Sequence, residues 1–332
     1  MRLKKIVSAV CLCSMAAITC VLLPGCGDDR YRTDEGMVWH TAYHVAYRSE
    51  RDMRDSIIST LDRVGASLNV FDPRSVASRA NASDSVPVDA DYIRVYEMSR
   101  HINQVSGGAF DPTLGPLITA WGFGKGHRAT ADTLRIDSLL ALTGIAKSRI
   151  ENGVLIKGNP HMEFNFSAIA KGYGCDQVAE MLERNGISDY LVEIGGEIRC
   201  AGISPSGGKW RVSIDRPVIS DSINHDSQRI VEISGCGMAT SGNYRNFHRD
   251  SSGVYGHTIS AKSGRPARTD VLSATVIAPT AMEADALATS MMALGSADAS
   301  VLARRLGYPV LLVLADSTAV EMNLSGAAVG AP

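Results

Sequence analysis

The chain has 332 residues, 45% of them hydrophobic, and a formal net charge of -2. This is a globular composition, long enough for a large core or for two fused subdomains. The sequence contains no basic block and its balance is slightly acidic, which argues against nucleic-acid binding.

The first 25 residues have the pattern of an export signal. Arg2, Lys4 and Lys5 form a positive start, and an apolar stretch follows over residues 6–23. A simple signal peptide or a membrane anchor is one interpretation. The small residues ahead of Cys26 and the polar residues after it instead resemble a bacterial lipoprotein cleavage box, which is the interpretation we favour.

We therefore divide the chain into a lipoprotein signal peptide (1–25), a tether (26–36), one domain (37–324) and a tail (325–332). Lipid on Cys26 would hold the protein to a membrane of the cell envelope without a spanning helix. Neither the inner nor the outer membrane is singled out. Three cysteines remain in the domain without CxxC spacing, and we expect them to be buried apolar residues rather than a disulfide framework. They are Cys175, Cys200 and Cys236.

The domain begins with alternating residues over 37–47, which predict one strand with Trp39 and Tyr47 on the same side. Its opposite side carries His40 and His44. Two histidines at this spacing can bind a metal, but no third ligand follows nearby, so a solvated or hydrogen-bonded pair is favoured.

Further along, amphipathic helices and short strands are mixed without strict alternation. Apolar residues at helical spacing predict helices over 52–68, 91–105, 137–142, 282–294 and 298–306. Short apolar runs separated by turns predict strands over 154–157, 163–166, 190–194, 197–201, 210–215, 230–233, 271–277, 309–314 and 320–322. The expected class is α+β, with mixed but largely antiparallel sheets and flanking helices.

The stretch over residues 164–196 stands out. Ser167 and Ala168 lead into a helix that carries Lys171 in its first turn, and a later strand ends in Gly195-Gly196. Unpaired N–H groups at a helix start, a lysine and glycines together suit an anion. A glycine pair after a strand is also an ordinary turn.

The helix over 282–294 carries a carboxylate among small apolar residues. Asp285 and Thr289 are four residues apart and therefore share one helix face. A hydrogen bond from Thr289 would satisfy a buried Asp285. Alternatively, both side chains and a backbone carbonyl bind a hard cation such as Mg²⁺.

One histidine on a later loop is a candidate general base. His257 follows a glycine, and the histidine pKa lies near neutral pH. Mere exposure on the surface is the alternative.

Seven segments, in this order, resemble the FAD:protein FMN transferase (ApbE) family and span most of the chain after the tether. They are GAFDPTLGPL (108–117), WGFG (121–124), SAIAKGYGCD (167–176), LVEIGGEI (191–198), TSGNYRNF (240–247), HTISAKSGRP (257–266) and TVIAPTAMEADALAT (275–289). The resemblance implies an ApbE-like, T-fold-related domain with FAD in a cleft between two subdomains. Members of this family are often lipoproteins that face the periplasm, which agrees with the interpretation of Cys26.

The resemblance also implies an activity. Such enzymes use Mg²⁺ and FAD as substrate, attach FMN to a Thr or Ser hydroxyl of a target flavoprotein, and release AMP. Targets include subunits of the sodium-pumping NADH:quinone reductase and of Rnf-type complexes. Some relatives hydrolyse FAD to FMN and AMP instead, and a non-enzymatic flavin-binding lipoprotein is a further alternative.

Site residues follow from the resemblance, position by position. The metal would be bound by the main-chain carbonyl of Ala168 and by the side chains of Asp285 and Thr289. The expected FAD contacts are Trp39, Phe71, Ala109, Phe110, Asp111, Asn165, Lys171 and Ile259.

Three positions depart from the family pattern. Asn165 replaces a common aspartate, so any contact that it makes is that of a neutral amide. His40 stands where glycine is usual, which would narrow the site or change FAD affinity. Ala288 lies where some members have an extra carboxylate, so we expect weaker Mg²⁺ binding.

Overall fold

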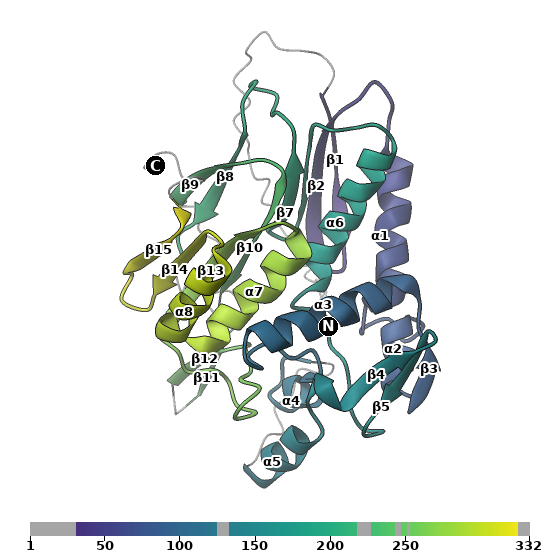
Figure 1. The fold of residues 1–332 in the computed structure, drawn as a ribbon, viewed down its shortest axis with the longest axis vertical. Coiled ribbons are helices and arrows are strands. Elements are labelled where there is room, and N and C mark those ends of the chain that lie inside the picture. Colours follow the sequence, from purple (N-terminus) through teal and green to yellow (C-terminus); the bar gives the residue numbers. More distant parts are fainter. Residues whose placement is uncertain (1–30, 125–132, 218–226, 243–246, 251–252, 325–332) are drawn as a thin grey trace, which may run out of the picture.

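A computed structural model describes residues 31–124, 133–217, 227–242, 247–250 and 253–324. Within these ranges the architecture is a large sheet with helices on one face and a smaller α/β region at one end (Figure 1). The predicted signal peptide (1–25), Cys26 and the predicted tail (325–332) lie outside the described residues. No described helix has the length and apolar character needed to span a bilayer.

The main sheet has eight strands, and each is antiparallel to its neighbours. Hairpin turns separate sequence neighbours such as β6 and β7, which explains the antiparallel pairing. In sheet order the strands are β1 (Tyr31–Val38), β2 (Thr41–Arg48), β6 (Tyr190–Ile194), β7 (Glu197–Ala201), β10 (Cys236–Gly242), β13 (Val271–Ala278), β14 (Val310–Leu314) and β15 (Ala319–Met322).

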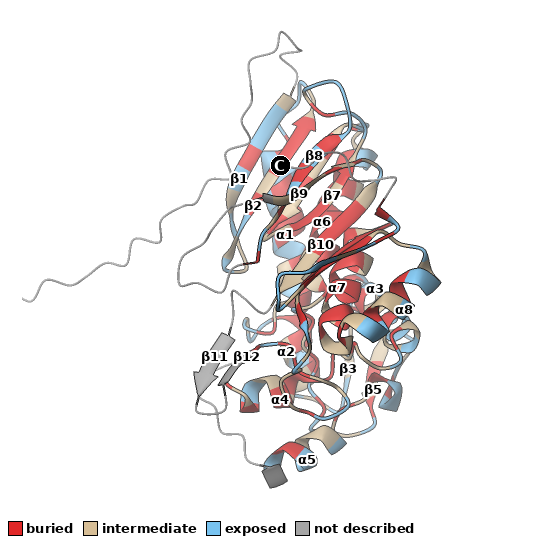
Figure 2. Cartoon of the chain, turned by 90° about the vertical axis from the view of Figure 1, so that its left-hand side faces the viewer, coloured by how far each residue is buried: buried red, intermediate tan, exposed pale blue. Residues whose placement is uncertain are grey.

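Helices cover one face of this sheet, and a hairpin packs on the other (Figure 2). The helices α6 (Ala170–Arg184) and α7 (Ala281–Leu294) lie against the sheet, with α1 (Arg54–Leu68) and α3 (Ala90–Val105) packed on them. The hairpin on the opposite face consists of β8 (Trp210–Asp215) and β9 (Ser227–Ile233).

The remaining elements are short. Two small sheets join β3 (Ser85–Pro87), β5 (Val154–Lys157) and β4 (Ser148–Glu151), and β11 (Phe247–Asp250) with β12 (Gly253–Gly256). The other helices are α2 (Val76–Asn81), α4 (Gly115–Ala120), α5 (Thr133–Ala141) and α8 (Ser296–Leu306), and a 3₁₀ turn spans Ile145–Lys147. The predicted α+β class with antiparallel sheets is confirmed.

Four local predictions need correction. Residues 31–36 belong to β1, paired residue by residue with β2, so the predicted tether ends before Tyr31. The single strand predicted over 37–47 is a hairpin, because Trp39 and His40 have positive φ and form its turn. Residues 163–166 form no extended strand, and β10 (Cys236–Gly242) is a strand where none was predicted between 230–233 and 271–277.

Candidate functional site

The centre of the candidate site is the crossing of α6 and α7. The backbone N–H of Gly172 in α6 donates a hydrogen bond to Asp285 Oδ2 of α7 at 3.1 Å. Lys171 Nζ lies 3.8 Å from the same carboxylate oxygen. The N-terminus of α6 therefore stabilises a carboxylate of the protein itself, because helix N-termini favour negative charge.

Glycine makes this crossing close. A Cβ atom on Gly172 would lie 2.2 Å from the Ala281 carbonyl oxygen, and one on Gly237 of β10 would lie 2.1 Å from the Ala281 nitrogen. Only hydrogen atoms fit at these two positions. The start of α7 is thus wedged between α6 and β10, which places Asp285 beside the first turn of α6.

Glu197 is a member of this cluster that the sequence interpretation missed. Its Oε1 lies 3.0 Å from Lys171 Nζ, and its side chain is 5% exposed. Glu197 opens β7 directly after the Gly195-Gly196 turn, whose residues both have positive φ. Glu197 lies within segment 191–198, which resembles the ApbE family. This resemblance was the sequence feature that could have identified it.

Burial controls the electrostatics of these three groups. It raises the pKa of Glu197 to about 8, with Lys171 opposing the rise. Burial also raises the pKa of Asp285, again against the attraction of Lys171. Burial would lower the pKa of Lys171, but Asp285 and Glu197 outweigh it and raise that pKa. Lys171 is therefore a fixed cation between two carboxylates, one of which tends to retain a proton.

Thr289 lies one helical turn beyond Asp285, as predicted. Its hydroxyl is 3.1 Å from the Ser241 hydroxyl of β10, so the Thr289–Asp285 hydrogen bond that would satisfy the carboxylate is not the one observed. Ala168 lies in the turn that precedes α6. Both contacts of Asp285 described above use Oδ2, which leaves Oδ1 without a hydrogen bond among the described residues.

These donors suit a hard cation in their chemistry. A carboxylate, a hydroxyl and a main-chain carbonyl are all oxygen ligands, which Mg²⁺ prefers. The described residues contain no group of three or more His, Cys, Asp or Glu side chains arranged for a metal. A site here would therefore contain fewer than three such side chains, and Asp285 is the acidic ligand that the resemblance implies.

The predicted nucleotide loop is held by its own hydrogen bonds. Asp111 Oδ1 accepts from the backbone and the hydroxyl of Thr113 at 2.8 and 2.6 Å, and Oδ2 accepts from Ile145 N at 3.2 Å. Burial raises the pKa of Asp111. Phe110 is 3% exposed and belongs to the core, whereas Ala109 is partly exposed. Asp111 thus fixes the loop.

Asn165 connects this loop to the start of α6. Its N–H donates to the Pro112 carbonyl at 2.7 Å, and its Oδ1 accepts from Ser167 N at 2.9 Å. This second bond forms an Asx turn, which Asn and Asp form equally well. The departure from aspartate therefore preserves the local structure while removing a charge.

The turn of the β1–β2 hairpin places Trp39 between two helices. A Cβ on Gly65 of α1 would lie 2.6 Å from Trp39 Nε1, and one on Gly174 of α6 would lie 2.7 Å from Trp39 Cη2. His40 has φ +64, a region that favours glycine. This backbone conformation therefore explains why the resemblance leads one to expect glycine at position 40.

Three further predicted residues, Ile259, His257 and Phe71, belong to neither α6 nor α7. Ile259 is 5% exposed and packs with Leu114 and Leu117. His257 is exposed, with its ring centroid 6.2 Å from that of Phe123. Phe71 is 49% exposed.

Asp176 is a second buried carboxylate that the sequence interpretation did not single out. Its two oxygens accept from Ala281 N and Met282 N, each at 2.9 Å, across 105 and 106 residues of sequence. Burial raises its pKa to about 6, although both backbone bonds oppose this. Asp176 of α6 therefore caps the start of α7, which carries Asp285.

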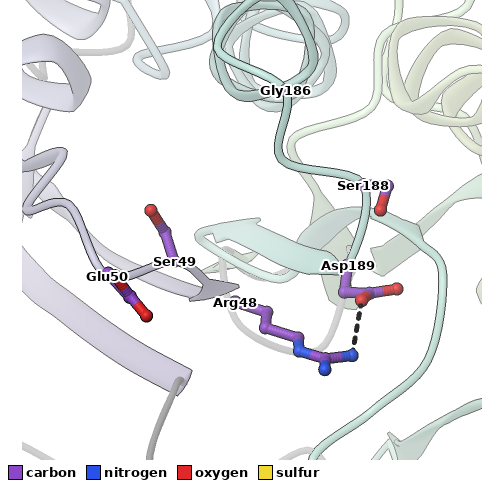
Figure 3. Close-up of a pocket in the computed structure, with 6 residues that line it drawn as sticks. All are labelled: Arg48, Ser49, Glu50, Gly186, Ser188 and Asp189. Atoms are coloured by element: carbon purple, nitrogen blue, oxygen red, sulfur yellow. Dashed lines mark hydrogen bonds and ion pairs between the residues drawn. The ribbon is translucent and has the colours of Figure 1, made fainter.

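A polar surface pocket lies elsewhere, at the end of β2 (Figure 3). Its lining includes Arg48 and Asp189, whose side chains form an ion pair at 3.4 Å. None of the predicted site residues lines it. We assign it no role in the chemistry.

Comparison with known proteins identifies the family of this chain. The family model described as "ApbE family" matches residues 37–312. The chain belongs to the ApbE family. An FAD:protein FMN transferase from Vibrio cholerae is 33% identical over 90% of this chain and 92% of its own length, and one from Haemophilus influenzae is 31% identical over 94% of both.

Solved ApbE structures share the fold. The flavin transferase ApbE from Vibrio cholerae superposes with a TM-score of 0.79 at 32% identity, covering 90% of this chain and 97% of that one. The apo flavinyl transferase ApbE from Pseudomonas stutzeri gives a TM-score of 0.79 at 30% identity, covering 88% and 94%.

Proposed function

We propose that this ApbE-family chain is a transferase that moves FMN from FAD to a Thr or Ser hydroxyl of a target flavoprotein and releases AMP. The observation that carries the proposal is the convergence of Lys171, Asp285 and Thr289 inside a family match over residues 37–312. Candidate acceptors are subunits of the sodium-pumping NADH:quinone reductase or of Rnf-type complexes.

The oxygen donors of Asp285, Thr289 and the Ala168 carbonyl would hold Mg²⁺ in this proposal. When bound, Mg²⁺ supplies positive charge that stabilises the leaving phosphate. Lys171, held by Glu197 at 3.0 Å, adds a second fixed cation. The bond from Gly172 N–H holds the Asp285 carboxylate in place before any ligand arrives.

His257 is our candidate for the group that accepts the proton of the attacking hydroxyl. Its side chain is exposed, so an acceptor protein can reach it without rearrangement of the core. Replacing His257 by Ala should lower the rate constant of transfer more than it changes FAD affinity. A variant with unchanged transfer would remove this role.

The test of the transferase proposal uses FAD, Mg²⁺ and a candidate acceptor, with the acceptor weighed by mass spectrometry. Asp285→Asn should reduce FMN attachment by about 100-fold or more, because it removes this acidic ligand. Asp298→Asn is the matched control, since Asp298 is exposed on the neighbouring helix α8.

Each outcome separates the alternatives. Free FMN and AMP without an acceptor would support an FAD pyrophosphatase, and tight FAD binding without either product would support a flavin-binding protein. Turnover independent of metal, or an unimpaired Asp285→Asn variant, would contradict the metal assignment.

We also propose lipid anchoring at Cys26 in the cell envelope. The signal-like residues 1–25 support this location. Metabolic labelling with a fatty-acid analogue should mark the wild type and not Cys26→Ala. Equal labelling of both chains would contradict the anchor.

A further inference from the structure

Two cysteines face each other on neighbouring strands of the main sheet. Cys200 of β7 lies directly opposite Cys236 of β10 in the antiparallel register. Directly opposite residues in such a pair have Cα atoms about 4.5 or 5.5 Å apart, and disulfides span about 4.4–6.8 Å between Cα atoms. The backbone register therefore already has the separation that a disulfide needs.

The two side chains also lie on the same face of the sheet. Cys200 belongs to the apolar cluster beneath the β8–β9 hairpin, and Cys236 packs against that cluster. Directly opposite residues on antiparallel strands have Cβ atoms about 4.5–5.5 Å apart, so the register places the two side chains side by side. Facing side chains in mutual contact satisfy the second requirement of a disulfide, which is convergent Cβ directions.

The surrounding structure fixes this pair and leaves one member accessible. The Ser234 hydroxyl donates to the Gly202 carbonyl at 2.6 Å, which ties the turn before β10 to the residues after β7. Cys200 is fully buried, whereas Cys236 is partly exposed at the start of its strand. An oxidant can therefore reach Cys236 first.

We propose that Cys200 and Cys236 are an intramolecular disulfide site that staples β7 to β10. This assignment does not depend on the proposed transferase activity. It does differ from the sequence-based expectation that these cysteines are only buried apolar residues. The register of two strands separated by the β8–β9 hairpin is what creates the pair.

The chemistry balances with an external disulfide as oxidant. The Cys236 thiolate attacks one sulfur of that disulfide, which releases one external thiol and leaves a mixed disulfide on Cys236. The Cys200 thiol then loses its proton and attacks the Cys236 sulfur, which releases the second external thiol. Two cysteine thiols are oxidised and one external disulfide is reduced. The neighbouring Cys200 thiol lowers the pKa of the Cys236 thiol, which favours Cys236 as the first nucleophile.

Cys175 is the internal control. It is buried in α6 on the other face of the sheet, where burial and the nearby carboxylate of Glu197 raise its pKa, and its thiol donates to the Glu197 carbonyl. It has neither a partner cysteine nor access to an oxidant among the described residues. It should stay a thiol under the same conditions.

The experiment treats the folded full chain with oxidised glutathione, alkylates free thiols and maps tryptic peptides without reduction. Peptides 200–209 and 230–245 should appear linked, while peptide 172–184 should carry an alkylated Cys175. The linked chain should unfold at a higher urea concentration than the reduced chain. Cys236→Ser should lose both the linked peptide and the stabilisation, and Cys175→Ser should keep them.

Three results would overturn the proposal. These are alkylated thiols in both peptides after oxidation, a glutathione adduct on Cys236 that never resolves, or a link that includes Cys175. Because the peptide map uses the wild-type chain, a variant that fails to fold does not affect the conclusion.

Discussion

Replacing Gly172 by Ala tests whether close backbone packing between α6 and α7 builds the site. The added Cβ would lie 2.2 Å from the Ala281 carbonyl oxygen, where ordinary contact begins at 3.4 Å, so the helices must separate by about 1.2 Å. Because the Ala281 carbonyl oxygen is a backbone atom, it cannot move aside by a change of rotamer. Overpacking typically costs about 1–3 kcal/mol, and a favourable Gly-to-Ala helix propensity of about 1 kcal/mol offsets part of it. We expect the upper end of that range, and thus a net loss of about 2 kcal/mol in the free energy of unfolding.

Gly174→Ala is the matched control in the same helix. Its Cβ would also meet a close neighbour, at 2.7 Å, but that neighbour is the Trp39 side chain and not backbone. The propensity gain is the same at both positions. The two variants therefore compare a backbone obstacle with a side-chain obstacle in one helix.

Urea unfolding, monitored by circular dichroism, gives the free energy of unfolding of each variant. The slope of this free energy against urea concentration should be the same in all chains. A second readout is FMN transfer, which should fall in Gly172→Ala because the separation pulls Gly172 N–H from Asp285 Oδ2. A Gly172→Ala chain as stable as the wild type, or more stable than Gly174→Ala, would refute the reasoning.

Three further predictions concern charge and backbone strain. Lys171→Met should destabilise the chain by about 3 kcal/mol in urea unfolding, because it leaves Glu197 and Asp285 without their cation, and adding Glu197→Gln should recover part of the loss. If Lys171→Met alone were as stable as the wild type, Lys171 would not stabilise the carboxylates of Glu197 and Asp285. His40→Gly should raise the free energy of unfolding by about 0.5–1 kcal/mol, since φ +64 strains any side chain; a thermal or urea scan that shows a loss would contradict this. Asp176 has a folded-state pKa of about 6 against an ordinary 3.8, so the folded state binds its proton more tightly than the unfolded state. The stability of the wild type relative to Asp176→Asn should therefore be greatest below about pH 4, fall as the pH rises to about 6, and stay level above it. Urea unfolding of both chains across this range measures the difference, and a difference that rises with pH would reverse the sign of the argument.

Local patterns determined most of the elements. Helical spacing located α1, α3, α7 and α8 within two residues of their observed starts, because each presents an apolar face to the core. The pair Asp285 and Thr289 was visible for the same reason, since residues four apart share a helix face. The strands of the main sheet were mostly recognised from short apolar runs between turns.

Other features depend on contacts between distant segments, which a local pattern does not encode. Whether Trp39 continues a strand or turns it was decided by strand pairing, which placed both turn residues at positive φ. Asp176 became the cap of α7 only because the two helices cross, and Glu197 became the partner of Lys171 only because β7 lies beside α6. Cys200 and Cys236 met through the register of β7 and β10.

The sequence alone therefore determined the family, the fold class and the chemical types of the candidate ligands, because these are properties of residue identity and local spacing. The tertiary structure decided which of those ligands are adjacent and how they are charged. The reason is physical. Burial raises the pKa of Asp285 and Glu197 only where packing has removed water. Lys171 offsets their charge only where α6, α7 and β7 converge.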